Sequence, residues 1–291
     1  MVFKAFVKPK AEVGLQAKDT YLPGAELPAE IRLTTQEEIK ARELRAELVG
    51  EETYYVKETH INSKGHAHTR TVKKNATFAS ITQTVAQAPT FSQGADQKWN
   101  ISLQVPPNAP PTCGGKYVDI RWTLKTVLDV PNRPDQSKEM ILRVLCPPPR
   151  VSGMSAVPAE KSYDDVTMSL QVSQVACAGE TLVGRLTLQV KNKLSPRSIR
   201  VELVRDEDAG AHKADEVIAK AEISGSASFN QQEVPSFDFT LAIPAAAPPT
   251  AVCAHSNLRW KVKAVIDRKM KTDFNVEQEV IVYNAPAPAG K

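Results

Sequence analysis

The sequence has 291 residues, of which 42% are hydrophobic and 24% are charged. This composition excludes a disordered chain and leaves room for two ordinary domains. The formal net charge of +4 is too small for a dedicated nucleic-acid binder, and no run of about 18 apolar residues predicts a membrane-spanning helix.

The N-terminal segment, Met-Val-Phe-Lys-Ala-Phe-Val-Lys-Pro-Lys, interrupts its apolar residues with lysines. A signal peptide needs an unbroken apolar stretch, so we expect the protein to remain cytoplasmic. Lys4, Lys8 and Lys10 are candidates for a basic strip that binds an acidic or phosphorylated tail of a protein partner. The alternative is an exposed edge strand that its lysines protect from pairing with other chains.

The next segments show that the chain repeats itself. Residues 23–33 resemble residues 178–188, because both combine a Gly-x-Glu or Gly-Glu turn with a period-two strand. Residues 35–50 carry helix signals, including a capping box of Thr35 and Glu38 and a C-terminal glycine. Their counterpart, residues 196–204, is β-branched and alternating. We therefore expect a strand over residues 42–49.

The first copy is longer than the second between Gly50 and Phe78, and the extra residues are hydrophilic. We expect an exposed hairpin or loop there. His60, His66 and His68 offer imidazoles to a transition metal, but the neighbouring lysines and arginine would repel a cation. Our expectation is an exposed segment without a bound metal.

A connection rich in proline appears twice. Val105-Pro-Pro-Asn-Ala-Pro-Pro-Thr112 recurs as Ile243-Pro-Ala-Ala-Ala-Pro-Pro-Thr250. A period-two strand precedes each connection, and another that contains Trp122 or Trp260 follows it. Prolines lack the backbone donor and end strand pairing. We expect both indoles to lie in hydrophobic cores, not on the surface as platforms for sugars.

The boundary between the copies begins at Cys146-Pro-Pro-Pro149, which starts a turn-rich spacer. We expect one domain over residues 1–146, a linker over 147–162 and a second domain over 163–291. About seven short strands in each half predict an all-β protein with two tandem immunoglobulin-like β-sandwiches.

Signals for catalysis are weak throughout the chain. The four cysteines form no Cys-x-x-Cys pair, and we expect free thiols. Cys113 lies on a turn, but no His or Asp is tied to it by pattern. We interpret Asp206, Glu207 and Asp208 as solvated charges near a strand end. We therefore expect no enzyme activity, no catalytic residue and no cofactor.

The ordered set of motifs, present in both halves, resembles the arrestin superfamily. Its parts are the Pro-Gly-x-Glu turn at residues 23–26, the Pro-Pro-Thr turns that end at Thr112 and Thr250, and the strand Ile120-Arg-Trp122. The resemblance covers nearly the whole chain. It implies tandem arrestin N-like and C-like β-sandwiches in a cytosolic adaptor or scaffold without enzyme activity.

Such an adaptor would bind protein partners through sheet edges, concave faces and loops, in trafficking or signalling, and would reach membranes through a membrane-protein partner. Val2-Phe-Lys4 resembles the start of the phosphate-sensing strand of receptor arrestins, although Ala5 replaces the second lysine of that strand. The alternative is a carbohydrate- or envelope-binding β-sandwich. It would need an export signal and exposed aromatic residues, and the sequence predicts neither.

Overall fold

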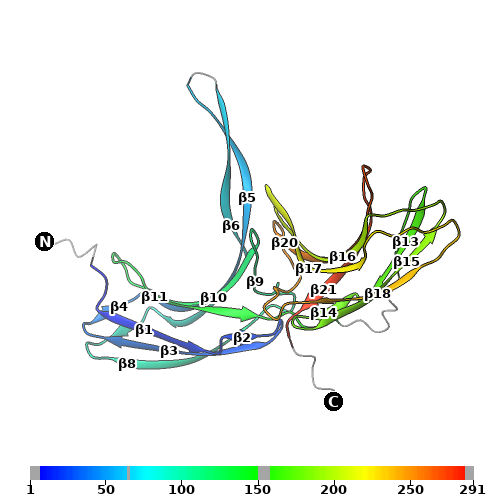
Figure 1. Ribbon diagram of the computed structural model, residues 1–291. Helices are drawn as coiled ribbons and strands as arrows, with labels where there is room; N and C mark the ends of the chain where they lie inside the picture. Colours follow the sequence, from blue (N-terminus) through cyan, green and yellow to red (C-terminus); the bar gives the residue numbers. More distant parts are fainter. Residues whose placement is uncertain (1–6, 64–65, 150–157, 286–291) are drawn as a thin grey trace, which may run out of the picture. The chain divides into compact units, whose positions relative to one another are not determined.

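The computed structural model describes residues 7–63, 66–149 and 158–285. Every regular element in these ranges is a β-strand (Figure 1), and none is a helix that could cross a lipid bilayer. Backbone contacts group the described residues into two compact units. Unit 1 draws on Met1–Tyr54, Lys73–Cys113 and Asp119–Leu145. Unit 2 draws on Tyr55–Val72, Gly114–Val118 and Cys146–Lys291.

Two main sheets form around the core of unit 1. The smaller sheet has the order β1 (Ala11–Ala17), β3 (Glu26–Thr35), β8 (Asp96–Gln104). The larger sheet has the order β2 (Thr20–Tyr21), β11 (Gln136–Val144), β10 (Asp119–Asp129), β5 (Glu43–Ile61), β6 (Ala67–Gln87), and β9 (Cys113–Gly114) pairs with β10. A short pair, β4 (Ile39–Lys40) and β7 (Thr90–Phe91), completes the unit.

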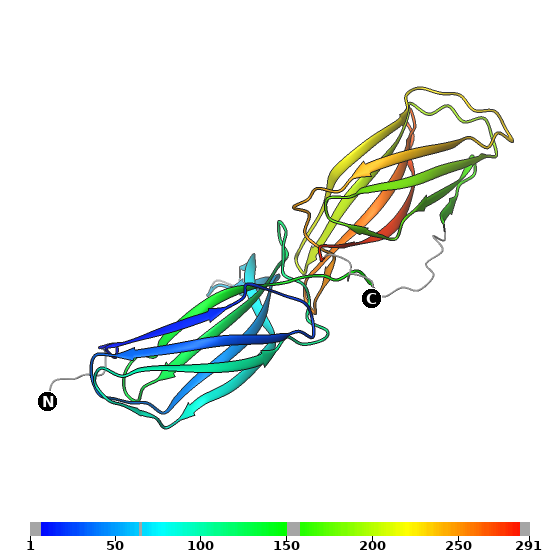
Figure 2. The ribbon, with the colours of Figure 1, turned by 90° about the horizontal axis from the view of Figure 1, so that it is seen from below.

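Unit 2 repeats this arrangement. Its smaller sheet has the order β12 (Ala159–Ser162), β13 (Val166–Val172), β15 (Thr181–Val190), β18 (Ser236–Ala242). Its larger sheet has the order β14 (Val175–Cys177), β21 (Phe274–Tyr283), β20 (Asn257–Asp267), β16 (Ser198–Ala209), β17 (His212–Ser224), and β19 (Ala251–Val252) pairs with β20. Figure 2 shows the two layers of strands. The expected all-β class with tandem sandwiches is confirmed, while residues 159–162, assigned to the linker from the sequence, form β12.

Alternation at period two explains how these strands build cores. On β3 the side chains of Leu27, Ala29, Ile31 and Leu33 are buried, and the residues that alternate with them are exposed or partly exposed. Trp122 and Trp260 are 0% and 1% exposed, so their expected core positions are confirmed. Both belong to strands that are paired on both sides in their larger sheets.

The repeated proline connection holds this tryptophan in each unit. The indole Nε1 of Trp122 donates a hydrogen bond to the carbonyl oxygen of Pro110 (2.9 Å). The equivalent bond of Trp260 is accepted by Pro248 (3.0 Å). A buried indole N–H needs such a partner, and a proline carbonyl at a turn is available because no strand uses it.

The threonine that follows the prolines fastens the last strand of each unit. Thr112 donates its backbone N–H to the carbonyl of Val144 (2.8 Å), and its hydroxyl oxygen accepts the Val144 N–H (2.9 Å). Thr250 and Val282 form the same two bonds at the same lengths. The threonine of the repeated Pro-Pro-Thr sequence therefore joins a loop to the final strand of each unit by two hydrogen bonds.

The ambiguous segment before Gly50 is a strand, as the second copy predicted. β5 covers Glu43–Ile61 and pairs with β10 along Glu43–Thr53. Gly50 lies inside this strand and does not cap a helix. A Cβ atom there would collide with the ring of Phe78, which packs edge-on against Trp122 with ring centroids 5.3 Å apart. The glycine thus makes room for an aromatic pair that belongs to the core.

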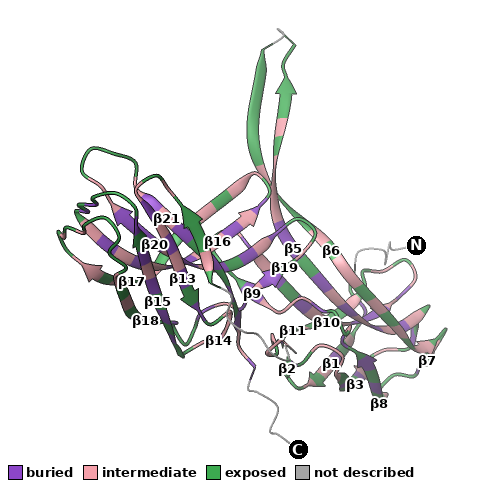
Figure 3. Cartoon of the chain, turned by 90° about the vertical axis from the view of Figure 1, so that its right-hand side faces the viewer, coloured by how far each residue is buried: buried purple, intermediate pink, exposed green. Residues whose placement is uncertain are grey.

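The extra residues of the first copy form a hairpin, here called the arm, over residues 55–72. Thr59 and Thr69 share a hydrogen bond across it (2.9 Å), and the Asn62 N–H donates to the carbonyl of His66 (3.0 Å). Most described side chains of the arm are exposed (Figure 3), including His60, His66 and His68. The expectation of an exposed hairpin is confirmed, and its described residues are mostly regular strand.

Shortening the arm is expected to leave the fold intact. Thr59 and Thr69 lie opposite each other, so an Asn-Gly turn in place of residues 59–69 preserves the pairing below it. The free energy of loop closure changes by only about 0.6 kcal/mol per doubling of loop length. The described residues of this range are exposed, so their removal takes away no buried side chain. Chemical denaturation should give an unfolding free energy within about 1 kcal/mol of the parent. Loss of cooperative unfolding would contradict this expectation.

Candidate functional site

The basic strip of Lys4, Lys8 and Lys10 is the partner site expected from the sequence. Lys4 lies outside the described residues. Lys8 and Lys10 are exposed and lie immediately before β1. Arg133 fixes the backbone of this segment, because its guanidinium donates to the carbonyl oxygens of Val7 (3.0 Å) and Lys8 (2.7 Å).

Glu37 completes the anchoring of the basic strip. Its Oε1 accepts the backbone N–H of Lys10 (2.9 Å) and pairs with the guanidinium of Arg133 (2.6 Å). The Lys10 hydrogen bond lowers the pKa of Glu37, and Arg133 lowers it further. The carboxylate is therefore charged at neutral pH. The backbone at Lys8 and Lys10 is fixed, while both side chains are exposed to solvent.

A hollow of about 470 Å³ lies on the outer face of the small sheet of unit 1. It is lined by side chains and backbone from β1, β3 and β8, namely Glu12, Gly14, Leu15, Gln16, Glu30, Arg32, Thr34 and Lys98. Its charges are matched in part: Lys98 lies 3.0 Å from Glu30, and Arg32 lies 2.6 Å from Asp96. β1 ends this sheet, so the hollow and the basic strip adjoin the same strand.

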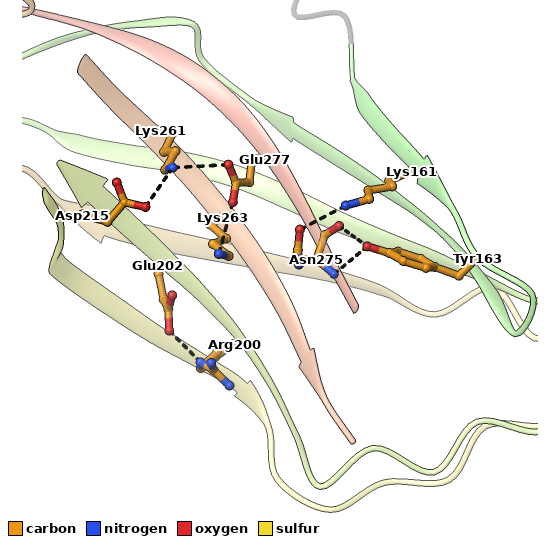
Figure 4. Close-up of polar contacts among 9 residues, drawn as sticks. All are labelled: Lys161, Tyr163, Arg200, Glu202, Asp215, Lys261, Lys263, Asn275 and Glu277. Atoms are coloured by element: carbon orange, nitrogen blue, oxygen red, sulfur yellow. Dashed lines mark hydrogen bonds and ion pairs between the residues drawn. The ribbon is translucent and has the colours of Figure 1, made fainter. Parts of the chain in front are cut away.

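A second polar surface, here called the polar face, covers the outer side of the larger sheet of unit 2 (Figure 4). Lys261 on β20 lies 3.2 Å from Asp215 and 3.5 Å from Glu277, and Lys263 lies 3.2 Å from Glu277. Burial of Lys261 opposes its charge, but Asp215 and Glu277 outweigh that effect and raise its pKa. These groups satisfy one another within the sheet.

The neighbouring part of the polar face is also internally bonded. The Tyr163 hydroxyl donates to the carbonyl oxygen of Asn275 (2.8 Å) and accepts the N–H of the same residue (3.1 Å). Lys161 donates to the side-chain oxygen of Asn275 (3.2 Å). A surface whose charges are already paired gains less from a charged partner than one with solvent-facing charges. The basic strip is therefore the stronger candidate.

Unit 2 also contains a buried carboxylate, Glu207, whose role the sequence did not indicate. Its side chain accepts three backbone N–H groups, from Lys116 (2.9 Å), Tyr117 (2.7 Å) and Val118 (3.1 Å). Arg205 forms an ion pair with it at 3.0 Å. Burial raises the pKa of Glu207, but the three donors and Arg205 outweigh burial, so the pKa is lowered.

The prediction of solvated charges at residues 206–208 is wrong for Glu207, which is 1% exposed. Alternation along β16 turns this side chain inward, toward the turn that contains Gly115. A Cβ atom on Gly115 would overlap the carboxylate, so the glycine permits the close approach. The turn at residues 114–118 and strand β16 form one bonded cluster within unit 2.

Three rings pack beside Glu207. Tyr117 stacks on His212 with ring centroids 4.6 Å apart and an interplanar angle of 10°. Tyr55 meets His212 edge-on at 4.5 Å, and its carbonyl oxygen accepts the N–H of Ala211 (2.8 Å). The base of the arm and the 114–118 turn are thus bound to the β16–β17 hairpin. The rings come from three separate parts of the sequence, and no local pattern connects them.

The remaining sequence candidates offer little reactivity. Cys113 is buried, and burial raises the pKa of Cys146 to about 11, which leaves almost no thiolate at neutral pH. Within the described part of the chain, no three His, Cys, Asp or Glu residues lie where they could hold a metal ion. Trp99 packs partly buried against the unit 1 core. With Trp122 and Trp260 in the cores, none of the three tryptophans offers an exposed platform for a sugar.

Comparison with known proteins gives a family match for the first half of the chain. Residues 11–148 match the family described as arrestin (or S-antigen), N-terminal domain. The matched range starts at β1 and ends in the prolines that follow β11. The search of curated proteins found no match.

Proposed function

We propose that this chain, a member of the arrestin superfamily through its N-terminal domain at residues 11–148, is an adaptor that binds an acidic or phosphorylated tail of a protein partner. Membership of this family indicates a non-enzymatic adaptor or scaffold role in general. The finer proposal is a cytoplasmic role in trafficking or signalling, with membranes reached through a membrane-protein partner.

The observation that carries the proposal is the anchored basic strip. Arg133 and Glu37 fix the backbone that carries Lys8 and Lys10, so binding an anion does not require ordering of that backbone. The adjoining strand β1 is an end strand, to which an extended tail can add by backbone hydrogen bonds. Lysines beside an open strand edge suit a tail that carries carboxylates or phosphates.

Charge reversal of the basic strip is expected to weaken binding of a doubly phosphorylated acidic peptide by tenfold or more. The variant combines Lys4→Glu, Lys8→Glu and Lys10→Glu. Exposed charges contribute little to stability, so the melting temperature should stay close to that of the parent. Binding of the parent should weaken as salt is raised past the point where the Debye length falls to about 8 Å. Fluorescence anisotropy with a labelled peptide over a salt series measures both effects.

The matched control reverses three exposed lysines of unit 2, Lys220, Lys269 and Lys271, which gives the same net charge. This control should retain peptide binding. Equal loss in both variants would indicate a general effect of net charge. Binding that responds neither to salt nor to reversal of the strip would remove the strip from the site.

A further inference from the structure

Strand β6 carries Arg70, Lys73 and Lys74 near its start, but the rest of its outer edge is uncharged. Residues 75–87, here called the β6 edge, read Asn-Ala-Thr-Phe-Ala-Ser-Ile-Thr-Gln-Thr-Val-Ala-Gln and contain no charged residue, proline or glycine. Among the described residues, β6 ends the larger sheet of unit 1 and has β5 as its one hydrogen-bonded neighbour. Exposed edges of this kind usually carry lysine, proline or a bulge, because their free N–H and C=O groups can pair with another chain.

Strand β17 provides an internal comparison, since it ends the larger sheet of unit 2 in the position that β6 has in unit 1. Its pairing with β16 contains two register shifts, which bend and twist an edge. It carries charged side chains along its length, namely Lys213, Asp215, Glu216, Lys220 and Glu222. The same position in the fold is therefore charged along its length in unit 2 and uncharged over residues 75–87 in unit 1.

The other long end strands are also charged. β1 carries Glu12, β8 carries Asp96 and Lys98, and β18 carries Asp238. Residues 75–87 of β6 are therefore the longest uncharged stretch of an end strand in the described sheets. Between Ala79 and Val85 its side chains alternate: Ile81 and Val85 pack against the unit 1 core, and Ser80, Thr82 and Thr84 are exposed.

We propose that the β6 edge pairs with the same edge of a second copy of this chain, antiparallel about a two-fold axis, so that two larger sheets become continuous. Self-pairing places a segment opposite itself, and like charges that meet across strands are destabilising. The β6 edge brings no charges together. Exposed Ser80 and Thr82 can form the hydroxyl pairs that stabilise neighbouring strands.

The absence of charge favours a second copy over a tail of a different protein. A foreign acidic or basic segment is selected by complementary charges, and the β6 edge has none to offer. The proposal is independent of the proposed adaptor function, because the basic strip precedes β1 and takes no part in this pairing.

Light scattering and sedimentation equilibrium over a range of protein concentrations test the proposal. The parent is expected to form dimers. The double variant Ser80→Lys with Thr82→Lys gives the β6 edge charged side chains like those of β17. The dissociation constant of the dimer should then rise by roughly tenfold or more. The control, Thr181→Lys with Gln189→Lys, adds the same charge to exposed positions of β15, which is paired on both sides, and should dimerise like the parent.

Hydrogen exchange on the parent locates the contact even if the lysine variant folds poorly. Backbone amides of residues 75–87 should exchange more slowly in a concentrated sample than in a dilute one, while those of β17 should not change. A parent that stays monomeric at all concentrations overturns the proposal. So does a dimer whose β6 amides exchange at the same rate as in the monomer, or one that the two lysines leave intact.

Discussion

Replacement of Trp122 by alanine is expected to lower the unfolding free energy of unit 1 by about 3–5 kcal/mol. The indole is fully buried, it packs edge-on against Phe78, and its N–H is satisfied by Pro110. Truncation leaves a cavity in a strand that is paired on both sides, where the backbone cannot collapse to fill it. The Pro110 carbonyl also loses its partner.

Guanidinium denaturation followed by far-ultraviolet circular dichroism measures this loss. Trp260→Ala is the matched variant, because Trp260 holds the equivalent place in unit 2. We propose from the sequence that residues 1–146 and 163–291 are separate domains. In that case each variant lowers the denaturation midpoint of the domain that carries the substitution and leaves the midpoint of the other domain unchanged. A Trp122→Ala protein within about 1 kcal/mol of the parent would show that the indole does not fill a core.

Removal of the Glu207 carboxylate is expected to have an effect of similar size, about 3–5 kcal/mol for Glu207→Ala. The substitution leaves three backbone N–H groups without their acceptor in a buried place. Arg205 loses its ion pair with Glu207 and keeps the one with Glu216 (2.6 Å). Each unpaired buried donor destabilises the folded state. Replacement of the exposed Glu139, which forms a surface ion pair with Lys125, should change stability by less than about 1 kcal/mol.

The contribution of Glu207 should depend on pH with a definite sign. Its pKa is lowered in the folded protein, so the charged form binds its donors more strongly than the protonated form. The stabilisation is fully present above the unfolded-state pKa of about 4.3 and is lost as the pH falls through the lower folded-state value. The stability difference between the parent and Glu207→Gln should therefore be constant above about pH 5 and shrink on acidification. A difference that does not vary with pH would show that folding leaves the pKa of Glu207 unchanged, and a difference that grows on acidification would show that folding raises it.

The sandwich architecture could be predicted because its signals are local. Period-two alternation marks the core faces of β3, β10 and β20, and the two tryptophans fall on those faces. The strand before Gly50 could be predicted only by comparison with the second copy, because its own sequence favours a helix. Pairing with β10 overrides this helix propensity. The position of Gly50 under the Phe78 ring depends on residues far apart in the sequence.

The surroundings of Glu207 could not be predicted for the same reason. Its donors lie about 90 residues earlier in the chain, and a Glu between two Asp residues is typical of a solvated strand end. The lysines of the basic strip could be found, because exposed cations in an N-terminal segment are a local feature. The Arg133 and Glu37 contacts that hold them could not, since Arg133 reaches back more than a hundred residues to Val7.

The separation between Glu207 and its donors has a consequence for synthesis on the ribosome. The 114–118 turn is translated about 90 residues before its acceptor, which at roughly 5–20 residues per second is an interval of about 5–20 seconds. During that interval the three N–H groups have only water as a partner. The turn and the base of the arm therefore reach their final packing only after β16 has been made, well after the first half of the chain.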